Sequence, residues 1–289
     1  MAAQAGESIA AIMRTIPRLR PLPEVATRVL QLLQDPDYEV GALIDIVRTD
    51  AALVARLLRL CNSARSGLGQ EMRAIGDAVA FLGSRHLVQL VLATCSTQTF
   101  AHARGGQLVD PAAVWRHSLA TAVACQRLCR DLDATARVSA FTVGILHGLG
   151  ALALDLAATP AQVSHAASLP PEMDELARER EVFGLDHGTA AGLVAASWQL
   201  PFNLAFALRG HDDDATLAGA DPLPAALHVG DRLAKQLLGT AGDAPPPCAP
   251  AALRRLALTD NSLANAAADA KVDLEAMAEL LNLASPIDR

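Results

Sequence analysis

The chain has 289 residues, of which 52% are hydrophobic and 19% charged, a composition that excludes a disordered protein. Aromatic residues make up only 3%, so alanine, leucine and valine must fill the core, and alanine and leucine are strong helix formers. We therefore expect an all-α fold. The net charge is −7, and residues 111–289 carry 13 basic and 21 acidic side chains. This acidic surplus argues against a nucleic-acid-binding surface, and no nucleic-acid partner is expected.

The cysteines and the apolar segments indicate the cellular compartment of the protein. Five cysteines form neither a CxxC pair nor a zinc-type quartet: Cys61, Cys95, Cys125, Cys129 and Cys248. The odd count without a signal peptide predicts a reduced, cytoplasmic protein. The most apolar run, residues 141–158, approaches the length of a membrane span but contains His147 and Asp155. We expect it to be a buried helix, with no transmembrane segment and no membrane partner.

Helical spacing of apolar residues recurs along the chain from residue 21 onward. Residues 21–34 predict a helix that ends at Asp35, because the residue before a proline avoids the α region. Asp50 is the predicted N-cap of a helix over 51–63. Further helices are predicted over 40–48, 75–81, 84–95, 111–130, 137–156, 172–182, 187–198, 202–210 and 222–238. Residues 251–284 predict two small helices with caps at Thr259 or Asp260 and at Asp273.

Glycine- and proline-containing connectors divide this series of helices. Residues 101–109 form the best internal boundary, and residues 239–250 are rich in glycine and proline, as in a linker. The sequence therefore predicts an N-terminal helical subdomain over 1–105, a helical bundle over 106–240, and a linker with a short helical tail over 241–289.

Four histidines and one aspartate in the predicted bundle have side chains that suit a divalent transition metal. They are His117, His147, His187, His211 and Asp231, spread over five predicted helices. Such side chains can converge inside a helical bundle, where a two-metal site clamps both oxygens of a phosphoryl displacement. The intervals between them follow no local motif, however, and a histidine on an apolar helix face is more often a core residue than a ligand. Periodicity alone leaves both interpretations open.

The chain resembles the HDOD family, the HD-related output domain of bacterial signalling proteins, over roughly residues 15–240. The segments that carry the resemblance begin with PRLRPLPEVATRVLQLLQDPD, DIVRTDAALVARLLRLCNSA and AIGDAVAFLG, and continue with VWRHSLATAVA, GILHGLGALAL, FGLDHGTAAGLVAASWQLP and HVGDRLA. The resemblance implies a bundle like the HD domain of metal phosphohydrolases and of cyclic di-guanylate phosphodiesterases. It also implies that six side chains mark a remnant metal site: His117, His147, His187, His211, Asp212 and Asp231.

Two departures from the HD pattern bear on activity. The resemblance places Gly148 where active relatives carry the Asp of the His-Asp dipeptide, a central metal ligand that bridges two ions where both are present. It also places Asp212 where they carry the second His of a later pair. Asp155 cannot replace the missing carboxylate, because seven residues of helix separate it from Gly148 by about 10 Å.

These departures favour a non-catalytic regulatory module that relays its state to signalling proteins through protein contacts. No cofactor is expected, although His117, His147, His211 and Asp231 are compatible with a single, weakly held divalent metal. The first alternative is a metal-dependent phosphohydrolase or cyclic-dinucleotide phosphodiesterase. The second is a sensor that holds a nucleotide or another small molecule in the former active-site cavity.

Overall fold

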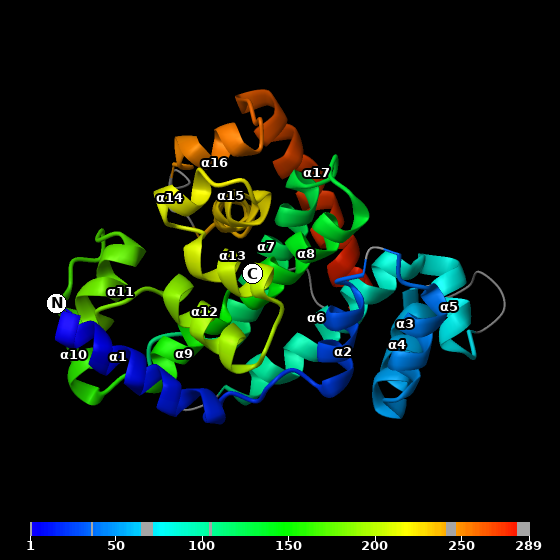
Figure 1. Ribbon diagram of the computed structural model, residues 1–289, viewed down its shortest axis with the longest axis horizontal. Helices are drawn as coiled ribbons and strands as arrows, with labels where there is room; N and C mark the ends of the chain where they lie inside the picture. The colour runs from blue at the N-terminus through cyan, green and yellow to red at the C-terminus, as the bar shows by residue number, and fades with distance from the viewer. Residues whose placement is uncertain (1, 36, 65–71, 104–105, 241–246, 282–289) are drawn as a thin grey trace.

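The computed structural model describes residues 2–35, 37–64, 72–103, 106–240 and 247–281, and within these ranges it contains helices and no β-strand (Figure 1). The predicted all-α fold is confirmed. The N-terminal part consists of α1 (Ala2–Thr15), the 3-10 turn η1 (Ile16–Arg18), α2 (Glu24–Leu32), α3 (Val40–Arg48), α4 (Ala51–Ala64), α5 (Ile75–Leu82) and α6 (Ser84–His102).

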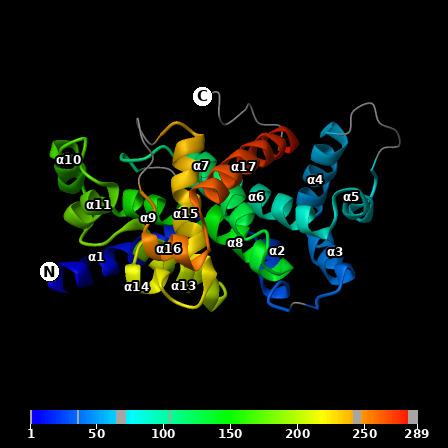
Figure 2. The same ribbon diagram turned by 90° about the horizontal axis from the view of Figure 1, so that it is seen from above.

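Helices α3, α4 and α5 lie together at one end of the long axis of the molecule in both views (Figures 1 and 2). Asp50 caps α4 as predicted, since its Oδ1 accepts a hydrogen bond from the Leu53 amide at 2.9 Å. The longer α6 leads from this end into the centre, where it contacts α7 (Pro111–Leu128) and α8 (Ala134–Leu146). It extends seven residues beyond the predicted end at residue 95, because its second half is buried among these helices.

The centre of the fold is a bundle of closely packed helices. It comprises α7 and α8 together with α9 (Leu149–Ala157), α12 (His187–Ser197), α13 (Phe202–Gly210) and α15 (Pro222–Leu237). Helix α7 packs on α8 and α15, while α12 packs on α9 and α13. Gly144 allows α8 to approach α7 closely, because a Cβ there would lie 2.4 Å from the Cα of Ala122. Gly230 plays the same part between α15 and α7, where a Cβ would lie 2.4 Å from Cys125 Sγ.

The apolar run over residues 141–158 is a core segment, as predicted. Among the described residues, one continuous helical stretch, Thr135–Ala157, is long and apolar enough to cross a membrane. Of its most apolar 18-residue segment, 89% is buried inside the fold. The pair α5 and α6 passes the same length and composition test only as a span bent by 117°. The single helix predicted over 137–156 divides into α8 and α9 at His147 and Gly148.

Short helices cover the bundle. They are α10 (Pro160–Ser168), α11 (Glu175–Phe183), α14 (Asp214–Leu217) and α16 (Pro250–Arg255), followed by the long α17 (Asp260–Leu280). Helices α10 and α11 lie at the opposite end of the long axis from α3–α5 (Figures 1 and 2). Thr259 caps α17 as predicted, but the predicted cap at Asp273 is wrong. Asp273 lies within α17, where its Oδ1 accepts from Arg127 Nη2 at 2.7 Å, so the helix continues through it.

The structure shows how the ends of the predicted segments pack, but it does not test the boundaries between them. Helix α1 contacts α9 and α12, and α17 contacts α7, so both ends of the described chain pack on the bundle. The central residues of the predicted linker, 241–246, lie outside the described residues, as do residues 104–105 of the predicted connector.

Candidate functional site

The histidines of the predicted constellation converge in the interior of the bundle. The ring centroids of His117 and His147 are 5.1 Å apart, and those of His187 and His211 are 5.2 Å apart. His147 joins the two pairs, with its centroid 6.3 Å from that of His211. Asp231 lies against the first pair and Asp212 against the second, so the structure brings together all six predicted side chains.

Helix ends and close helix contacts position these side chains. His147 is the C-cap of α8, His211 is the C-cap of α13, and His187 begins α12. His117 and Asp231 lie within α7 and α15 and face each other because Gly230 lets these helices approach. Gly150 brings α9 onto α12, where a Cβ would lie 1.9 Å from the carbonyl oxygen of His187. The glycines of the apolar run therefore serve helix packing.

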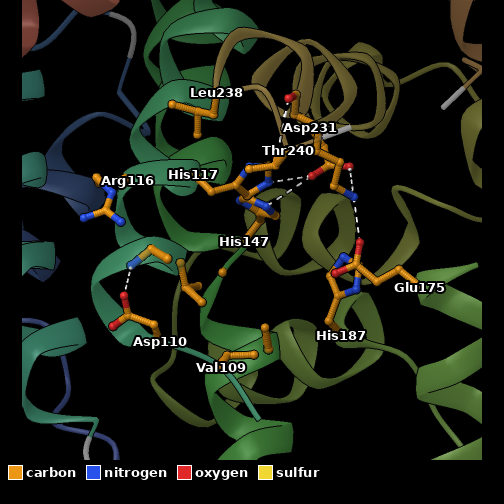
Figure 3. Close-up of a pocket in the computed structure, with 15 residues that line it drawn as sticks. Val109, Asp110, Arg116, His117, His147, Glu175, His187, Asp231, Leu238 and Thr240 are labelled. Carbon is orange, nitrogen blue, oxygen red and sulfur yellow. Dashed lines mark hydrogen bonds and ion pairs between the residues drawn. The ribbon is translucent and has the colours of Figure 1, made fainter. Parts of the chain in front are cut away.

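Asp231 is the centre of the first half of the site (Figure 3). Its Oδ1 is 2.8 Å from His117 Nε2 and 3.6 Å from His147 Nε2. Its Oδ2 is 3.0 Å from Lys235 Nζ. Burial opposes ionisation of this carboxyl, but the hydrogen bond from His117 and the charge of Lys235 hold its pKa well below the usual range. Asp231 is therefore a buried carboxylate whose charge the chain itself compensates.

Two of the histidines have the tautomer that metal ligands adopt. His147 Nδ1 donates to the Gly144 carbonyl at 2.8 Å, and His211 Nδ1 donates to the Leu208 carbonyl at 2.9 Å. Because a carbonyl only accepts, each ring keeps the lone pair on Nε2. Burial lowers the pKa of His147 and lowers that of His211 to about 4, so neither imidazole is charged near neutral pH. The Nε2 atom of His211 is buried and has no hydrogen-bond partner among the described residues.

Asp212 is held between the second histidine pair and a set of neighbours on α15. Its Oδ2 is 3.2 Å from His211 Nε2. Its Oδ1 accepts from His228 Nδ1 at 2.9 Å and from Arg232 Nη1 at 3.2 Å. Burial raises the pKa of Asp212, but the hydrogen bond from His228 and the charges of Arg232 and His187 outweigh it and lower the pKa overall.

His187 forms a pair with a carboxylate on α11. Glu179 Oε2 is 2.8 Å from His187 Nδ1 and accepts from the His187 amide at 2.8 Å. Burial alone would lower the pKa of His187, but the charge and hydrogen bond of Glu179 raise it to about 10. One helical turn earlier, Glu175 Oε2 is 2.7 Å from Lys235 Nζ, so α11 supplies a carboxylate to each half of the site.

Sequence reasoning missed five members of this network: Glu175, Glu179, His228, Arg232 and Lys235. The i,i+4 spacing of Asp231 and Lys235 was a readable signal for an ion pair on one helix face. Glu175 and Glu179 share the same spacing, but nothing local indicates that α11 folds against α15.

The donor chemistry fits one cation better than two. The ligand atoms of His117, His147 and Asp231 lie within 4.8 Å of one another, as do those of His187, His211 and Asp212. At Gly148, a Cβ would lie 2.4 Å from Ser118 Oγ, 2.7 Å from Val114 Cγ1 and 3.2 Å from Phe100 Cε1. This position therefore supplies no ligand, and a carboxylate there would meet packed side chains.

Asp155, the one carboxylate on α9, is occupied elsewhere. Its Oδ1 accepts from the backbone amides of Gln107 and Leu108 at 2.7 Å each. It fixes the connector before α7, and it does not replace the missing ligand, as expected from its distance along the helix.

A cavity of about 450 Å³ opens beside the cluster. His117, His147, His187, Asp231 and Lys235 form its polar wall, while side chains such as Val109, Val114 and Leu238 form its apolar wall. Arg116 also lines the cavity but points away from the histidines (Figure 3). The cavity leaves room for a small molecule next to the buried carboxylate.

Comparison with solved structures shows proteins of the same fold. The chain is 18% identical to an HDOD domain protein of unknown function from Geobacter sulfurreducens (TM-score 0.70; 96% of this chain, 97% of that chain). It is 24% identical to a protein from Shewanella amazonensis SB2B that carries the provisional name phosphohydrolase (TM-score 0.66; 96% and 98%). It is 21% identical to a provisionally named signal transduction protein from Marinobacter aquaeolei VT8 (TM-score 0.72; 96% and 66%).

Comparison with curated sequences and family models agrees with these structures. An uncharacterized protein of Treponema pallidum (strain Nichols) is 21% identical over 204 residues, which cover 67% of this chain and 38% of that protein. The chain thus spans well under half the length of this curated relative. The family model of the HDOD domain matches residues 19–214, more than half of the chain. With the fold and the histidine cluster in place, this match shows that the chain belongs to the HDOD family.

Proposed function

We propose that this chain is a regulatory HDOD module that does not hydrolyse phosphodiesters and acts through contacts with signalling proteins. The observation that carries the proposal is the state of Asp231. His117 and Lys235 bind its two oxygens at 2.8 and 3.0 Å, and His147 lies 3.6 Å from the first. The carboxylate that would anchor a catalytic metal is thereby integrated into a network of protein side chains.

Lys235 opposes a catalytic metal by its charge. Its ammonium lies between Asp231 and Glu175, 3.0 and 2.7 Å from their oxygens. A divalent cation on Asp231 would share the carboxylate with this fixed positive charge, and like charges at such distances repel strongly where solvent is largely excluded. The network therefore supplies its own cation.

The absence of a bridging carboxylate at position 148 distinguishes this site from a two-metal centre. One cation fits the donors of His117, His147 and Asp231, and when bound it would act as a Lewis acid and lower the pKa of a coordinated water. A two-metal phosphoryl displacement needs two ions held about 3.5–4 Å apart. Gly148 offers no carboxylate to hold them, and Ser118 and Val114 lie where its side chain would extend.

The names of the structural neighbours agree with a regulatory role in one case and with a hydrolytic role in the other. The Marinobacter protein is named for signal transduction, which agrees with a regulatory role, while the Shewanella protein carries a phosphohydrolase name. Since both are less than 25% identical to this chain, the residues of the site weigh more than either name.

The decisive experiment compares hydrolysis by the wild type and by site variants. Purified protein is assayed on bis(p-nitrophenyl) phosphate and on cyclic di-guanylate, with manganese, magnesium or ferrous iron supplied. We expect the wild type to match Asp231→Asn and His147→Ala at the level of the blank. A turnover that both substitutions abolish would overturn the proposal and establish a phosphohydrolase.

A second experiment addresses the regulatory role. The gene is deleted in the organism that encodes it, and the resulting phenotype is complemented with wild type or with Asp231→Asn. A non-catalytic module predicts that a folded Asp231→Asn protein complements as well as wild type. Loss of complementation by a protein that folds and accumulates normally would contradict this role.

A further inference from the structure

A second cavity, of about 310 Å³, lies among α6, α7, α8 and α17, away from the histidine cluster. Helices α7 and α8 form a hairpin, with His117 and His147 toward one end and Arg127 and Arg137 toward the other. Ten residues of helix separate His117 from Arg127, which corresponds to about 15 Å along the axis. This cavity is therefore distinct from the candidate functional site.

The cavity is strongly cationic. Four arginines line it, namely Arg85, Arg127, Arg130 and Arg137, against a single lining carboxylate, Asp273. Asp273 binds Arg127 through both of its oxygens. Arg130 has Asp269 at 3.4 Å and Asp131 at 3.6 Å. Arg85 and Arg137 have no carboxylate partner among the residues that the structure describes, so the lining retains a surplus of positive charge.

Two buried donors in the same lining have no acceptor. Gln89 is only 1% exposed, and its Nε2 has no hydrogen-bond partner in the described part of the chain. The buried Nε of Arg137 also has none, although Arg137 Nη1 donates to the Arg130 carbonyl at 3.2 Å and so fixes the guanidinium. Buried donors without acceptors are rare in native proteins because they lose their bonds to water.

We propose that this cavity binds a phosphoryl group, as free phosphate or as part of a phosphorylated small molecule. Unpaired N–H donors together with unpaired guanidinium charges match an anion that offers several acceptor oxygens, and arginine suits phosphate geometry in particular. Val123 and Met277 also line the cavity and provide an apolar surface for the carbon part of such a ligand. No second carboxylate lines the cavity to repel it.

The position of the cavity gives binding a structural consequence. Gln89 and Arg85 belong to α6, Arg137 to α8, and Met277 to α17. A phosphoryl group held by Arg85, Gln89 and Arg137 would join α6 to the hairpin that carries His117 and His147, and the carbon part of a larger ligand would contact Met277 of α17. Occupancy would therefore stabilise the docking of α6.

The test titrates the full chain with inorganic phosphate, and separately with pyrophosphate, at low ionic strength and constant chloride. Melting temperature and ³¹P linewidth report binding. We expect both ions to raise the melting temperature of the wild type. Arg137→Met and Gln89→Leu should each weaken phosphate binding by about tenfold or more, since each removes a hydrogen bond to a charged group. The matched control is Arg59→Met, an exposed arginine of α4 outside the cavity, which should bind as wild type does.

Gln89→Leu separates binding from a merely structural role. It replaces an unpaired buried donor by an apolar side chain of similar size, so the ligand-free protein should be at least as stable as wild type. The same variant should lose its response to phosphate. The proposal is overturned if phosphate neither shifts the melting temperature nor broadens the ³¹P signal. It is equally overturned if Gln89→Leu folds and responds like wild type, or if His117→Ala abolishes the response while Gln89→Leu keeps it.

Discussion

Lys235 Nζ lies 3.0 Å from Asp231 Oδ2, one turn along α15, while the other oxygen of the same carboxylate is 2.8 Å from His117 Nε2. The two carboxylate oxygens thus face different groups, a lysine on one side and the histidines on the other. Burial lowers the pKa of Lys235, but Asp231 and Glu175 outweigh it and raise the pKa overall, so the ammonium stays charged.

Removing this ammonium should allow a metal ion to bind more tightly to His117, His147 and Asp231. We expect Lys235→Met to bind manganese about tenfold more tightly than wild type or better, because a fixed positive charge next to Asp231 is gone. Without metal, the variant should lose about 3 kcal/mol of unfolding free energy, since a buried carboxylate is left without its partner. Titration calorimetry and urea unfolding measure the two effects.

Lys271 provides the matched control for this experiment. It is the only other lysine of the chain and is exposed on α17. Lys271→Met should leave both manganese affinity and stability within about 0.5 kcal/mol of wild type. If Lys235→Met behaved like Lys271→Met in both measurements, the ion pair would not control the site.

Gly148 provides a second prediction, because its surroundings are full. A Cβ there would lie 2.4 Å from Ser118 Oγ and 2.7 Å from Val114 Cγ1. Gly148→Asp should therefore cost about 1–3 kcal/mol of stability through overpacking, and manganese should not restore it. Adding Ser118→Ala, which removes the nearest atom, should recover part of the loss. Urea unfolding with and without manganese gives these values.

Gly76 is the control glycine for this test. It lies within α5, and a Cβ there would meet no atom within 4 Å. Gly76→Ala should stabilise the protein by up to about 1 kcal/mol, because alanine is the better helix former. A Gly148→Asp protein as stable as wild type that gained manganese affinity would show that position 148 still accepts a metal ligand.

The sequence predicts those features of the fold that local chemistry determines. Helix starts with a capping side chain, such as Asp50 and Thr259, are placed correctly, and the range Phe202–Gly210 agrees to the residue. Helix α1 was not predicted; its Ile12 is buried, and the helix contacts the distant α9 and α12. The predicted cap at Asp273 failed for the same reason, since the role of this residue is to bind Arg127 on α7.

The residues of the candidate site also fall into two groups, those that the sequence indicates and those that depend on tertiary packing. The four histidines and Asp231 were singled out by their side-chain chemistry, and the family resemblance supplied their correspondence with metal ligands. The pairing of Lys235 with Glu175 joins residues sixty positions apart, and the buried Gln89 of the cationic cavity has no sequence signal at all. Both depend on how α11 and α17 fold back on the bundle, which local periodicity does not specify.

The packing of α17 leads to a third prediction. Leu274 is fully buried, whereas Val272 on the same helix is 64% exposed. Leu274→Ala should cost about 2–5 kcal/mol of unfolding free energy through lost burial and the resulting cavity. Val272→Ala, a truncation in the same helix, should stay within about 0.5 kcal/mol of wild type. Equal, small effects in urea unfolding would mean that α17 is a detachable tail and not a part of the core.

The thiols supply a fourth prediction, because four of the five cysteines are buried and only Cys248 is partly exposed. Burial raises the pKa of Cys95 and of Cys129 to about 12, and it raises that of Cys125 well above the usual value. The thiolate is the reactive form of cysteine. A disulfide reagent at pH 8 should therefore modify one thiol of the native protein quickly. The other four should react only after denaturation, and Cys248→Ser should remove the fast phase.

The same raised pKa values predict how stability changes in alkaline solution. A thiol whose pKa is about 12 in the folded state and about 9 in the unfolded state stays protonated longer when folded. Its contribution to stability is complete below pH 9 and is lost as the pH rises toward 12, by about 1.4 kcal/mol per pH unit for each such group. Urea unfolding of wild type and of Cys95→Ala between pH 8 and 11 measures this slope. The slope should be smaller in the variant, and equal slopes would show that the Cys95 thiol titrates alike in both states.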